Sequence, residues 1–229
     1  MSIINLYNQD CMPALEKMKV NQYSLAIVDP PYNINISNDD RFGKSFCKAV
    51  TKRKNYIKKE WDNKQPDINY FNQLFRISKN QIIWGVNYYK HIDLTGGRIF
   101  WDKNTADGFT NSAGELAYKS FGICIDIIRY TWNGMLQENM KNKQQRIHPT
   151  EKPIALYKWL LKKYAKEGDT ILDTHGGSMS IVIACIEMGY SIDCYEIDKD
   201  YFNDAVKRIQ IHISQGNLFM EKPELKLFK

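Results

Sequence analysis

Short apolar runs that end at turn residues recur along the chain and define its predicted strands. We expect strands over 24–28, 81–84, 98–101, 123–130, 170–172 and 191–195. Several of these runs are almost continuously apolar, which is typical of strands that are covered on both faces of a parallel sheet. The pattern therefore predicts a buried, mainly parallel sheet.

Helical periodicity fills several of the intervals between these runs. After Pro153, apolar residues at positions 154, 157, 160, 161 and 164 alternate with a stripe of Lys158, Lys162 and Lys166. Residues 178–188 predict a buried helix that ends at Gly189, and residues 199–214 predict an amphipathic helix. Strands that alternate with helices predict an α/β fold.

No internal repeat and no linker interrupts this rhythm, so we expect residues 1–229 to form a single domain. Residues 33–66 do not fit this alternation of strands and helices, because they form a long polar segment. We expect this segment, and a second one at about 104–147, to be loops inserted into the domain. Long irregular segments within a compact domain are usually functional or disordered.

The composition agrees with a folded domain and excludes several other classes. Hydrophobic residues make up 43% of the 229 residues and aromatic residues 13%, which is ample for a buried core. No apolar run approaches the roughly 18–20 residues that cross a bilayer, and the N-terminus lacks a signal pattern. The five cysteines form no C-x-x-C pair and the four histidines are scattered, so no zinc site is predicted. We therefore expect a cytoplasmic protein without a bound metal or a membrane partner.

The formal net charge of +6 conceals an uneven distribution. Residues 41–64 and 141–166 each carry a net charge of +7, which leaves −8 on the rest of the chain. Two cationic segments on an acidic body suit contact with a polyanion, although solvated surface charge is the alternative. The first segment also contains Phe42, Tyr56 and Trp61, and such a mixture favours contact with phosphates and bases.

A glycine-containing turn follows the predicted strand 170–172. It reads Asp173-Thr174-His175-Gly176-Gly177-Ser178 and leads into the predicted helix. Such a turn brings backbone N–H groups close to a ligand at a helix N-terminus, or serves only for tight geometry. The next predicted strand ends at Glu196, which is placed to accept hydrogen bonds from a ribose diol. Neither G-x-G-x-x-G nor a Walker A sequence is present, which disfavours a pyrophosphate or triphosphate ligand.

The most specific sequence, Asp29-Pro30-Pro31-Tyr32, lies directly after the predicted strand 24–28. Open α/β sheets bind their ligands at this place, the carboxyl end of a strand. A turn that merely ends the strand is the alternative. Four specified residues arise by chance in roughly one chain of this length in a thousand, which favours a functional motif.

This tetrapeptide resembles the signature of the DNA amino-methyltransferases, which methylate the N6 of adenine or the N4 of cytosine with S-adenosylmethionine. Other stretches that resemble the same family are 3–11, 100–103, 115–117, 148–153 (His-Pro-Thr-Glu-Lys-Pro) and 196–202. The tetrapeptide precedes the glycine turn, which is the order of the family's circularly permuted beta class. The resemblance implies a Rossmann-like S-adenosylmethionine-dependent methyltransferase fold, circularly permuted, with a mixed, mostly parallel seven-stranded sheet.

The glycine turn departs from the family pattern. The usual D-P-F-x-G-S-G-T reads D-T-H-G-G-S-M-S here, so Met179 replaces the second glycine. That glycine normally permits close approach of the helix or the cofactor. The D-T-H opening resembles phage-type, stand-alone methyltransferases. Weak cofactor binding stays an alternative, as does a DNA-binding protein with a decayed cofactor site.

The resemblance also assigns roles to individual residues. The catalytic residues would be Asp29, Pro30, Pro31 and Tyr32, with Asp29 and the Pro30 carbonyl accepting the amino hydrogens and Tyr32 stacking on the base. Glu196 would bind the ribose hydroxyls, Asp10 the adenine amine and Thr150 the methionine carboxylate. The other expected cofactor-binding residues are Cys11, Lys152, Asp173, Thr174, His175, Gly177 and Ser178.

We therefore expect site-specific methyl transfer to the N6 of adenine in double-stranded DNA, with the target base flipped out of the helix. Cytosine N4 is the nearer alternative, although that group more often carries Ser at the position of Asp29. The residues expected to bind DNA are Arg41, Lys44, Lys48, Lys52, Arg53, Lys54, Lys58 and Lys59. The permuted class often forms dimers, so a homodimer is a further expectation.

The C-terminal tail carries two short apolar motifs, at 215–219 and 224–228. They resemble peptides that dock on bacterial sliding clamps, and a terminus that packs on the domain is the alternative. We expect a nucleoid-associated protein of a bacterial cell or an infected host, in a restriction–modification system, a phage or a mobile element.

Overall fold

The computed structural model describes residues 1–34, 62–105, 112–133, 136–215 and 222–228. All eight residues expected to bind DNA, from Arg41 to Lys59, lie outside the described residues. The same is true of most of the loop expected over 33–66.

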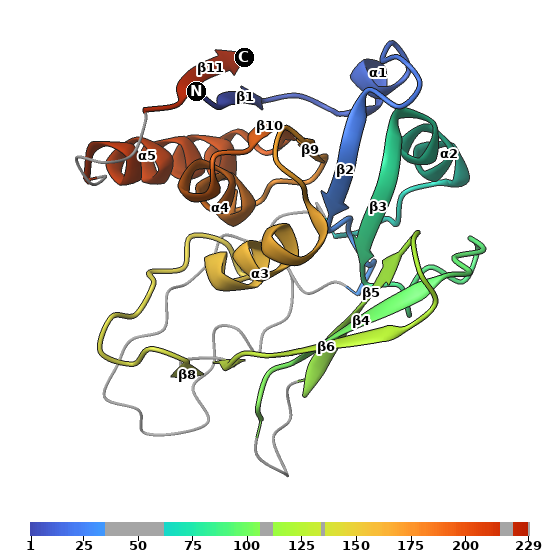
Figure 1. Ribbon diagram of the computed structural model, residues 1–229, viewed down its shortest axis with the longest axis horizontal. Helices are drawn as coiled ribbons and strands as arrows, with labels where there is room; N and C mark the ends of the chain where they lie inside the picture. The colour runs from blue at the N-terminus through green and yellow to red at the C-terminus, as the bar shows by residue number, and fades with distance from the viewer. Residues whose placement is uncertain (35–61, 106–111, 134–135, 216–221, 229) are drawn as a thin grey trace.

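A nine-stranded sheet forms the centre of the described molecule (Figure 1). Its order is β11-β1-β10-β9-β2-β3-β5-β4-β6, and β5 alone among them runs against the others. The strands are β1 (Ile3–Tyr7), β2 (Tyr23–Val28), β3 (Ser78–Trp84), β4 (Gly97–Asp102), β5 (Gly114–Lys119), β6 (Ile125–Arg129), β9 (Thr170–Asp173), β10 (Ser191–Tyr195) and β11 (Glu224–Phe228). A separate antiparallel pair joins β7 (Trp132–Asn133) to β8 (Leu136–Gln137). The predicted α/β fold with a mostly parallel sheet is confirmed.

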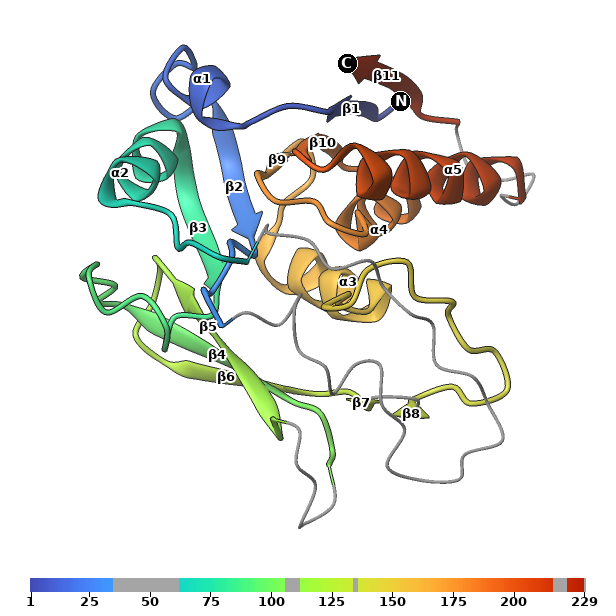
Figure 2. The ribbon, with the colours of Figure 1, turned by 180° about the vertical axis from the view of Figure 1, so that it is seen from behind.

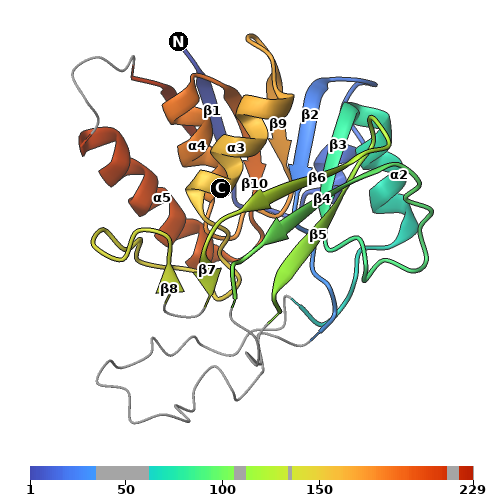
Figure 3. The ribbon, with the colours of Figure 1, turned by 60° about the horizontal axis from the view of Figure 1, so that its bottom comes forward.

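Helices cover both faces of this sheet. They are α1 (Met12–Leu15), α2 (Ile68–Ile77), α3 (Ile154–Tyr164), α4 (Ser180–Met188) and α5 (Lys199–Gln215). In Figure 3, α3 and α4 lie in front of β10 and β9. Strand β2 shows how the two layers divide the side chains: Leu25 and Ile27 pack with α3, α4 and α5, whereas Ala26 and Val28 pack with α1 and α2. Burial on both faces explains why this strand is almost continuously apolar.

The number of strands differs from the expected seven, because the sheet has nine. Part of the range 104–147, which we expected to be an inserted loop, forms β5 within the sheet, whereas the strand expected over 123–130 is present as β6. Strand β5 escaped prediction because polar Glu115 and Lys119 flank its short apolar stretch. In the structure ion pairs compensate the burial of both residues, so the sequence lacks the apolar run that usually marks an interior strand.

Strand β11 adds an edge to the sheet beside β1. Ile3 pairs with Glu224 and Tyr7 with Phe228 in parallel register, so β1 and β11 lie side by side at the top of Figures 1 and 2. The rings of Tyr7 and Phe228 stack with centroids 4.5 Å apart, and Tyr7 stacks equally closely on Tyr195. Asn8 N donates to Phe228 O at 2.9 Å. The tail motif at 224–228 therefore supports the loop that follows β1.

Within the described residues, no helix has the length and apolar character needed to span a membrane.

Candidate active site

A pocket of about 460 Å³ opens at the carboxyl edge of the sheet. Its walls come largely from the residues that follow four neighbouring parallel strands, β1, β10, β9 and β2. The remaining walls come from α2 and α3, with Tyr70 and Tyr157, and from the segments that precede these helices, 64–67 and 148–152. Helices α2 and α4 leave β2 and β9 on opposite faces, so the pocket includes the point where the winding of the sheet reverses. Doubly wound sheets bind their ligands at such a point.

Asp29 belongs to an ion-pair cluster on the β2 side of the pocket, in which Lys152 contacts both carboxylates. Lys152 Nζ lies 2.5 Å from Asp29 Oδ2 and 2.9 Å from Glu115 Oε2. The Tyr32 hydroxyl donates a hydrogen bond to Asp29 Oδ1. Glu115, on β5, also accepts from Lys103 Nζ at 2.6 Å. Both carboxylate oxygens of Asp29 are therefore held by protein donors.

Burial and pairing together set the charges in this cluster. Burial raises the pKa of Asp29 above its usual range, even though Lys152 opposes the shift. Burial also opposes ionisation of Glu115, but Lys152 and Lys103 outweigh it and lower the pKa of Glu115 to about 2. At Lys152, burial disfavours the ammonium, whereas Asp29 and Glu115 favour it and raise its pKa. Lys152 is thus a buried cation at neutral pH.

The main-chain carbonyl of Pro30 has a protein donor as well. The buried Tyr89 hydroxyl donates a hydrogen bond of 2.7 Å to Pro30 O. A carbonyl oxygen has two lone pairs, so a second donor can still bind there. Two consecutive prolines restrict the backbone that carries this oxygen. Asp29 and the Pro30 carbonyl are therefore two acceptors whose positions are fixed before any ligand arrives.

Tyr32 is packed firmly behind the pocket wall. Its ring stacks on Tyr88 with centroids 4.8 Å apart. A Cβ added to Gly85, whose φ is +76°, would lie 2.2 Å from Tyr32 Cε1, so only glycine fits beside the ring. Asp62 Oδ1 accepts from the backbone N–H groups of Tyr32 and Asn33, at 3.0 and 2.9 Å. The orientation of Tyr32 is therefore determined from both the ring and the backbone.

Two carboxylates stand beyond β9, on the other side of the pocket. Glu196 Oε2 accepts from Gly177 N at 2.7 Å, and its Oε1 accepts from Asp198 N at 2.7 Å. Asp10 is exposed, and its Oδ1 accepts from Met12 N at 2.9 Å. A carboxylate has about four lone-pair sites, so both groups can accept further bonds from hydroxyls or amines of a ligand.

The glycine turn is closely packed against β10. Gly176 N donates to Tyr195 O at 2.7 Å, and a Cβ on Gly176 would lie 2.7 Å from Cys194 Sγ. Asp173 is buried, and its Oδ1 accepts from His175 N at 3.0 Å. Burial raises the pKa of Asp173 to about 7, even though this hydrogen bond acts to lower it.

Thr174 is not part of the pocket wall but joins a buried chain of hydrogen bonds behind it. Its hydroxyl lies 2.7 Å from the Tyr70 hydroxyl and 2.9 Å from His175 Nδ1. Burial lowers the pKa of His175 to about 4, so its imidazole is neutral at physiological pH. His175 lines the pocket, whereas Thr174 supports it from behind.

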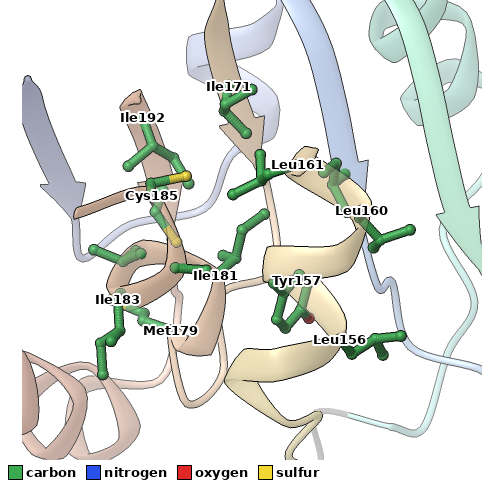
Figure 4. Packing of buried hydrophobic residues seen from close by; sticks show 14 of the residues in the cluster. Leu156, Tyr157, Leu160, Leu161, Ile171, Met179, Ile181, Ile183, Cys185 and Ile192 are labelled. Atoms are coloured by element: carbon green, nitrogen blue, oxygen red, sulfur yellow. The ribbon is translucent and has the colours of Figure 1, made fainter. Parts of the chain in front are cut away.

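Met179, the departure from the family pattern, does not reach the pocket. It precedes α4 in the left-handed conformation, with φ of +51°. Its side chain is fully buried in the core cluster drawn in Figure 4, near Ile181 and Ile183. The methionine therefore fills the core and leaves the pocket wall to its neighbours.

Most of the predicted catalytic and cofactor-binding residues converge on this pocket. Its walls include Asp10, Cys11, Asp29, Pro31, Thr150, Lys152, His175, Gly177, Ser178 and Glu196. Pro30, Tyr32, Asp173 and Thr174 lie outside its wall. Burial raises the pKa of the Cys11 thiol to about 12, so it stays protonated. Among the described residues, no group of three or more His, Cys, Asp or Glu is placed to hold a metal ion.

Several other residues of the site carried no recognisable signal in the sequence. Tyr70 and Tyr89 belong to no motif, yet one lines the pocket and the other binds the Pro30 carbonyl. Asp62 and Gln65 lie in the expected polar loop, where charge suggests solvent exposure. In the structure both hold the backbone of Tyr32, Gln65 through a bond of 2.9 Å from its Nε2 to Tyr32 O.

The fold and the site together define a methyltransferase-type α/β protein. The sheet is doubly wound, acidic residues follow β1, β2 and β10, and a glycine turn follows β9. The sequence profile of the N6/N4 DNA methylases matches residues 83–207, more than half of the chain. The chain therefore belongs to this DNA methylase family, which confirms the resemblance drawn from residues 29–32.

Individual relatives agree with this membership. The type II methyltransferase M.HpaI of Haemophilus parainfluenzae is 35% identical over 68 residues, which are 30% of this chain and 22% of that protein. The DNA adenine methyltransferase YhdJ of Escherichia coli (strain K12) is 23% identical over 251 aligned positions, which cover 88% of this chain and 81% of YhdJ.

Solved structures share the fold at low sequence identity. The M1.HpyAVI–SAM complex superposes with a TM-score of 0.54 at 18% identity, covering 90% of this chain and 100% of that one. The cytosine-N4-specific PvuII DNA methyltransferase gives 0.59 at 12% identity, covering 99% and 95%.

Proposed function

We propose that the protein transfers a methyl group from S-adenosylmethionine to the N6 of adenine in double-stranded DNA. The observation that carries the proposal is the pair of fixed acceptors, Asp29 and the Pro30 carbonyl, beside a pocket with two further carboxylates. Membership of the DNA methylase family and the adenine specificity named for YhdJ support it.

The pocket residues fit S-adenosylmethionine. Asp10 suits the adenine amine and Glu196 the ribose hydroxyls, because both are acceptors that can take further hydrogen bonds. Thr150 and the turn 175–178 would hold the methionine end. The volume of about 460 Å³ lies within the usual range for small-molecule sites. When bound, the cofactor supplies an electrophilic methyl group on a sulfonium.

The chain's own residues would prepare the amino group for attack. The lone pair of an adenine amino nitrogen is delocalised into the ring, so the nitrogen is a poor nucleophile. Asp29 and the Pro30 carbonyl would accept hydrogen bonds from its two N–H groups and thereby localise the lone pair on the nitrogen. Because both acceptors are fixed in advance, catalysis comes from position and electrostatics.

Tyr88 limits how a flipped base could stack on Tyr32. Tyr88 covers one face of the Tyr32 ring. A base that leaves the DNA helix must therefore use the other face, or Tyr88 must move. Unstacking from DNA costs a few kcal/mol, which contacts of this kind would partly offset.

Nucleoside analysis tests the proposal directly. The protein is incubated with duplex DNA and S-adenosylmethionine that carries a labelled methyl group, and the DNA is digested to nucleosides. We expect labelled N6-methyl-2′-deoxyadenosine, and none with Asp29→Ala. Labelled N4-methyl-2′-deoxycytidine would instead establish the cytosine alternative, which the similarity to the cytosine-N4-specific PvuII enzyme supports. Absence of label together with absence of heat in calorimetry with S-adenosylmethionine would establish a decayed cofactor site.

We further propose three partners for the protein: DNA phosphates, a second copy of the chain, and a sliding clamp. The basic segment 41–64 would bind DNA phosphates, and a homodimer would be detected by light scattering. In the structure the motif 224–228 is strand β11, so its binding to a sliding clamp would require release from β1. Equal retention on a clamp column with and without residues 215–229 would refute that interaction. A role in restriction–modification, suggested by M.HpaI, and association with the nucleoid are proposals of the same kind.

A further inference from the structure

Lys152 is an unusual lysine for a cofactor-binding residue. Its side chain is 3% exposed, and its Nζ contacts Asp29 at 2.5 Å and Glu115 at 2.9 Å. The nearest aromatic groups are Trp84 and Tyr32, whose ring centroids lie 5.3 and 5.8 Å from Nζ. Thr150, two residues earlier, turns toward His148 Nδ1 at 3.1 Å. Within the His-Pro-Thr-Glu-Lys-Pro stretch, the threonine and the lysine therefore contact different partners.

We propose that Lys152 is a positioning residue that acts through Asp29, keeping its carboxylate ionised and oriented as an acceptor for the target amino group. The proposal rests on the function proposed above. It replaces the cofactor-binding role that the family resemblance implied for this lysine.

The need for a cation at this place follows from burial. A protonated carboxyl group carries one proton donor and has less acceptor capacity than a carboxylate, so it is a poorer partner for an amino group. Burial favours the protonated form of Asp29, and the nearby charge of Glu115 favours it further. Lys152 is the cation that opposes both effects, and the Tyr32 hydroxyl assists by donating to the other oxygen.

Glu115 keeps the lysine in place from the opposite side. It belongs to the interior strand β5 and is also paired with Lys103. With a pKa of about 2, Glu115 stays ionised over the range in which activity is measured. Among the carboxyl groups that interact electrostatically with Asp29, this leaves Asp173, whose pKa burial raises to about 7, as the second candidate for a titration between pH 4 and pH 9. The other groups near Asp29 are the phenols of Tyr32, Tyr70, Tyr89 and Tyr157, which stay neutral there because burial raises their pKa values.

The first test compares Lys152→Met and Lys152→Arg with the unmodified protein. Single-turnover methyl transfer at saturating cofactor is measured from pH 5 to pH 9, and S-adenosylmethionine affinity is measured by calorimetry. For Lys152→Met we expect a rate loss of about 100-fold at neutral pH, an acid limb shifted upward by about one pH unit or more, and affinity within threefold. Removal of the cation raises the pKa of Asp29, so activity should partly recover as the pH rises. Lys152→Arg keeps the positive charge, so its acid limb should lie close to that of the unmodified protein.

Lys119→Met is the matched control. Lys119, at the other end of β5 from Glu115, is a second buried lysine in an ion pair, but its partner is Asp126 on β6. Its loss should lower stability without moving the acid limb or the affinity. Asp173→Asn separates the two candidate titrations, because a limb that belongs to Asp29 persists in this variant.

A direct measurement keeps the proposal testable even without methyl transfer. The titration of the Asp29 carboxyl carbon is followed by NMR with ¹³C-labelled aspartate and assigned with Asp29→Asn. An upward shift in Lys152→Met supports the proposal. An unmoved Asp29 titration, or a loss of cofactor affinity with an unchanged rate for the bound complex, overturns it. Absence of any methyl transfer by the unmodified protein refutes the proposed function alone, since the NMR comparison does not depend on it.

Discussion

Replacement of Met179 by glycine should destabilise the protein and leave its cofactor affinity unchanged. The variant restores the residue that the family pattern places here, so its two effects on stability can be compared. Relief of the left-handed conformation gains about 1–2 kcal/mol. Loss of the fully buried side chain costs about 2–5 kcal/mol, and the flexibility of glycine costs a further 0.5–1 kcal/mol or so. The loss of the buried side chain outweighs the relief of the left-handed conformation, so the free energy of unfolding should fall by about 3 kcal/mol.

Met179→Ala isolates the contribution of the backbone. Alanine loses nearly the same core contacts but keeps the left-handed strain, so it should be less stable than Met179→Gly by about 1 kcal/mol. Urea unfolding gives the free energies of all three proteins, and calorimetry gives their affinities for S-adenosylmethionine. A glycine variant as stable as the unmodified protein would refute the packing argument. A change in affinity greater than threefold would show that the side chain affects the pocket.

Three further predictions concern the acceptors and their neighbours. Asp29→Ala should abolish methyl transfer while equilibrium dialysis still detects cofactor binding, and loss of both would assign Asp29 a different role. Tyr89→Phe removes the donor to the Pro30 carbonyl, which is worth about 1–3 kcal/mol, so the single-turnover rate should fall roughly tenfold, and an unchanged rate would contradict this. Between pH 3.8 and about 7 folded Asp173 keeps a proton that the unfolded chain releases, so stability should fall as the pH rises through this window. Urea midpoints at pH 5 and pH 8 should differ less in Asp173→Asn, and an identical difference would refute the assignment.

The sequence was most informative where local pattern and burial coincide. The apolar run before Asp29 is strand β2, and the predicted helices after Pro153 and before Gly189 are α3 and α4. Side chains that follow parallel strands meet at one edge of a sheet, so Asp29, Glu196 and the glycine turn could be placed near one another in advance.

Prediction failed where burial is offset by charge. Strand β5 has Glu115 and Lys119 facing ion-pair partners, and such positions look solvated in a sequence. Asp62 was hidden for the same reason, since it follows a run of basic residues but is 1% exposed. Lys152 was grouped with Thr150 because the two lie in one motif. Side-chain directions in irregular backbone do not follow from sequence spacing, which is why only the structure separates their partners.

The position of β1 has a consequence for how the protein is made. Its neighbours in the sheet are β10 and β11, and Asn5 binds Asp193 across 188 residues of chain. Strand β1 therefore cannot complete these pairings until β10 and β11 have been synthesised. Pairings between such distant segments also form slowly, because the long intervening loop must close first. Asp10 lies directly after β1, so the cofactor pocket is assembled late, and a nascent chain that stops before β10 has no place to bind the methyl donor.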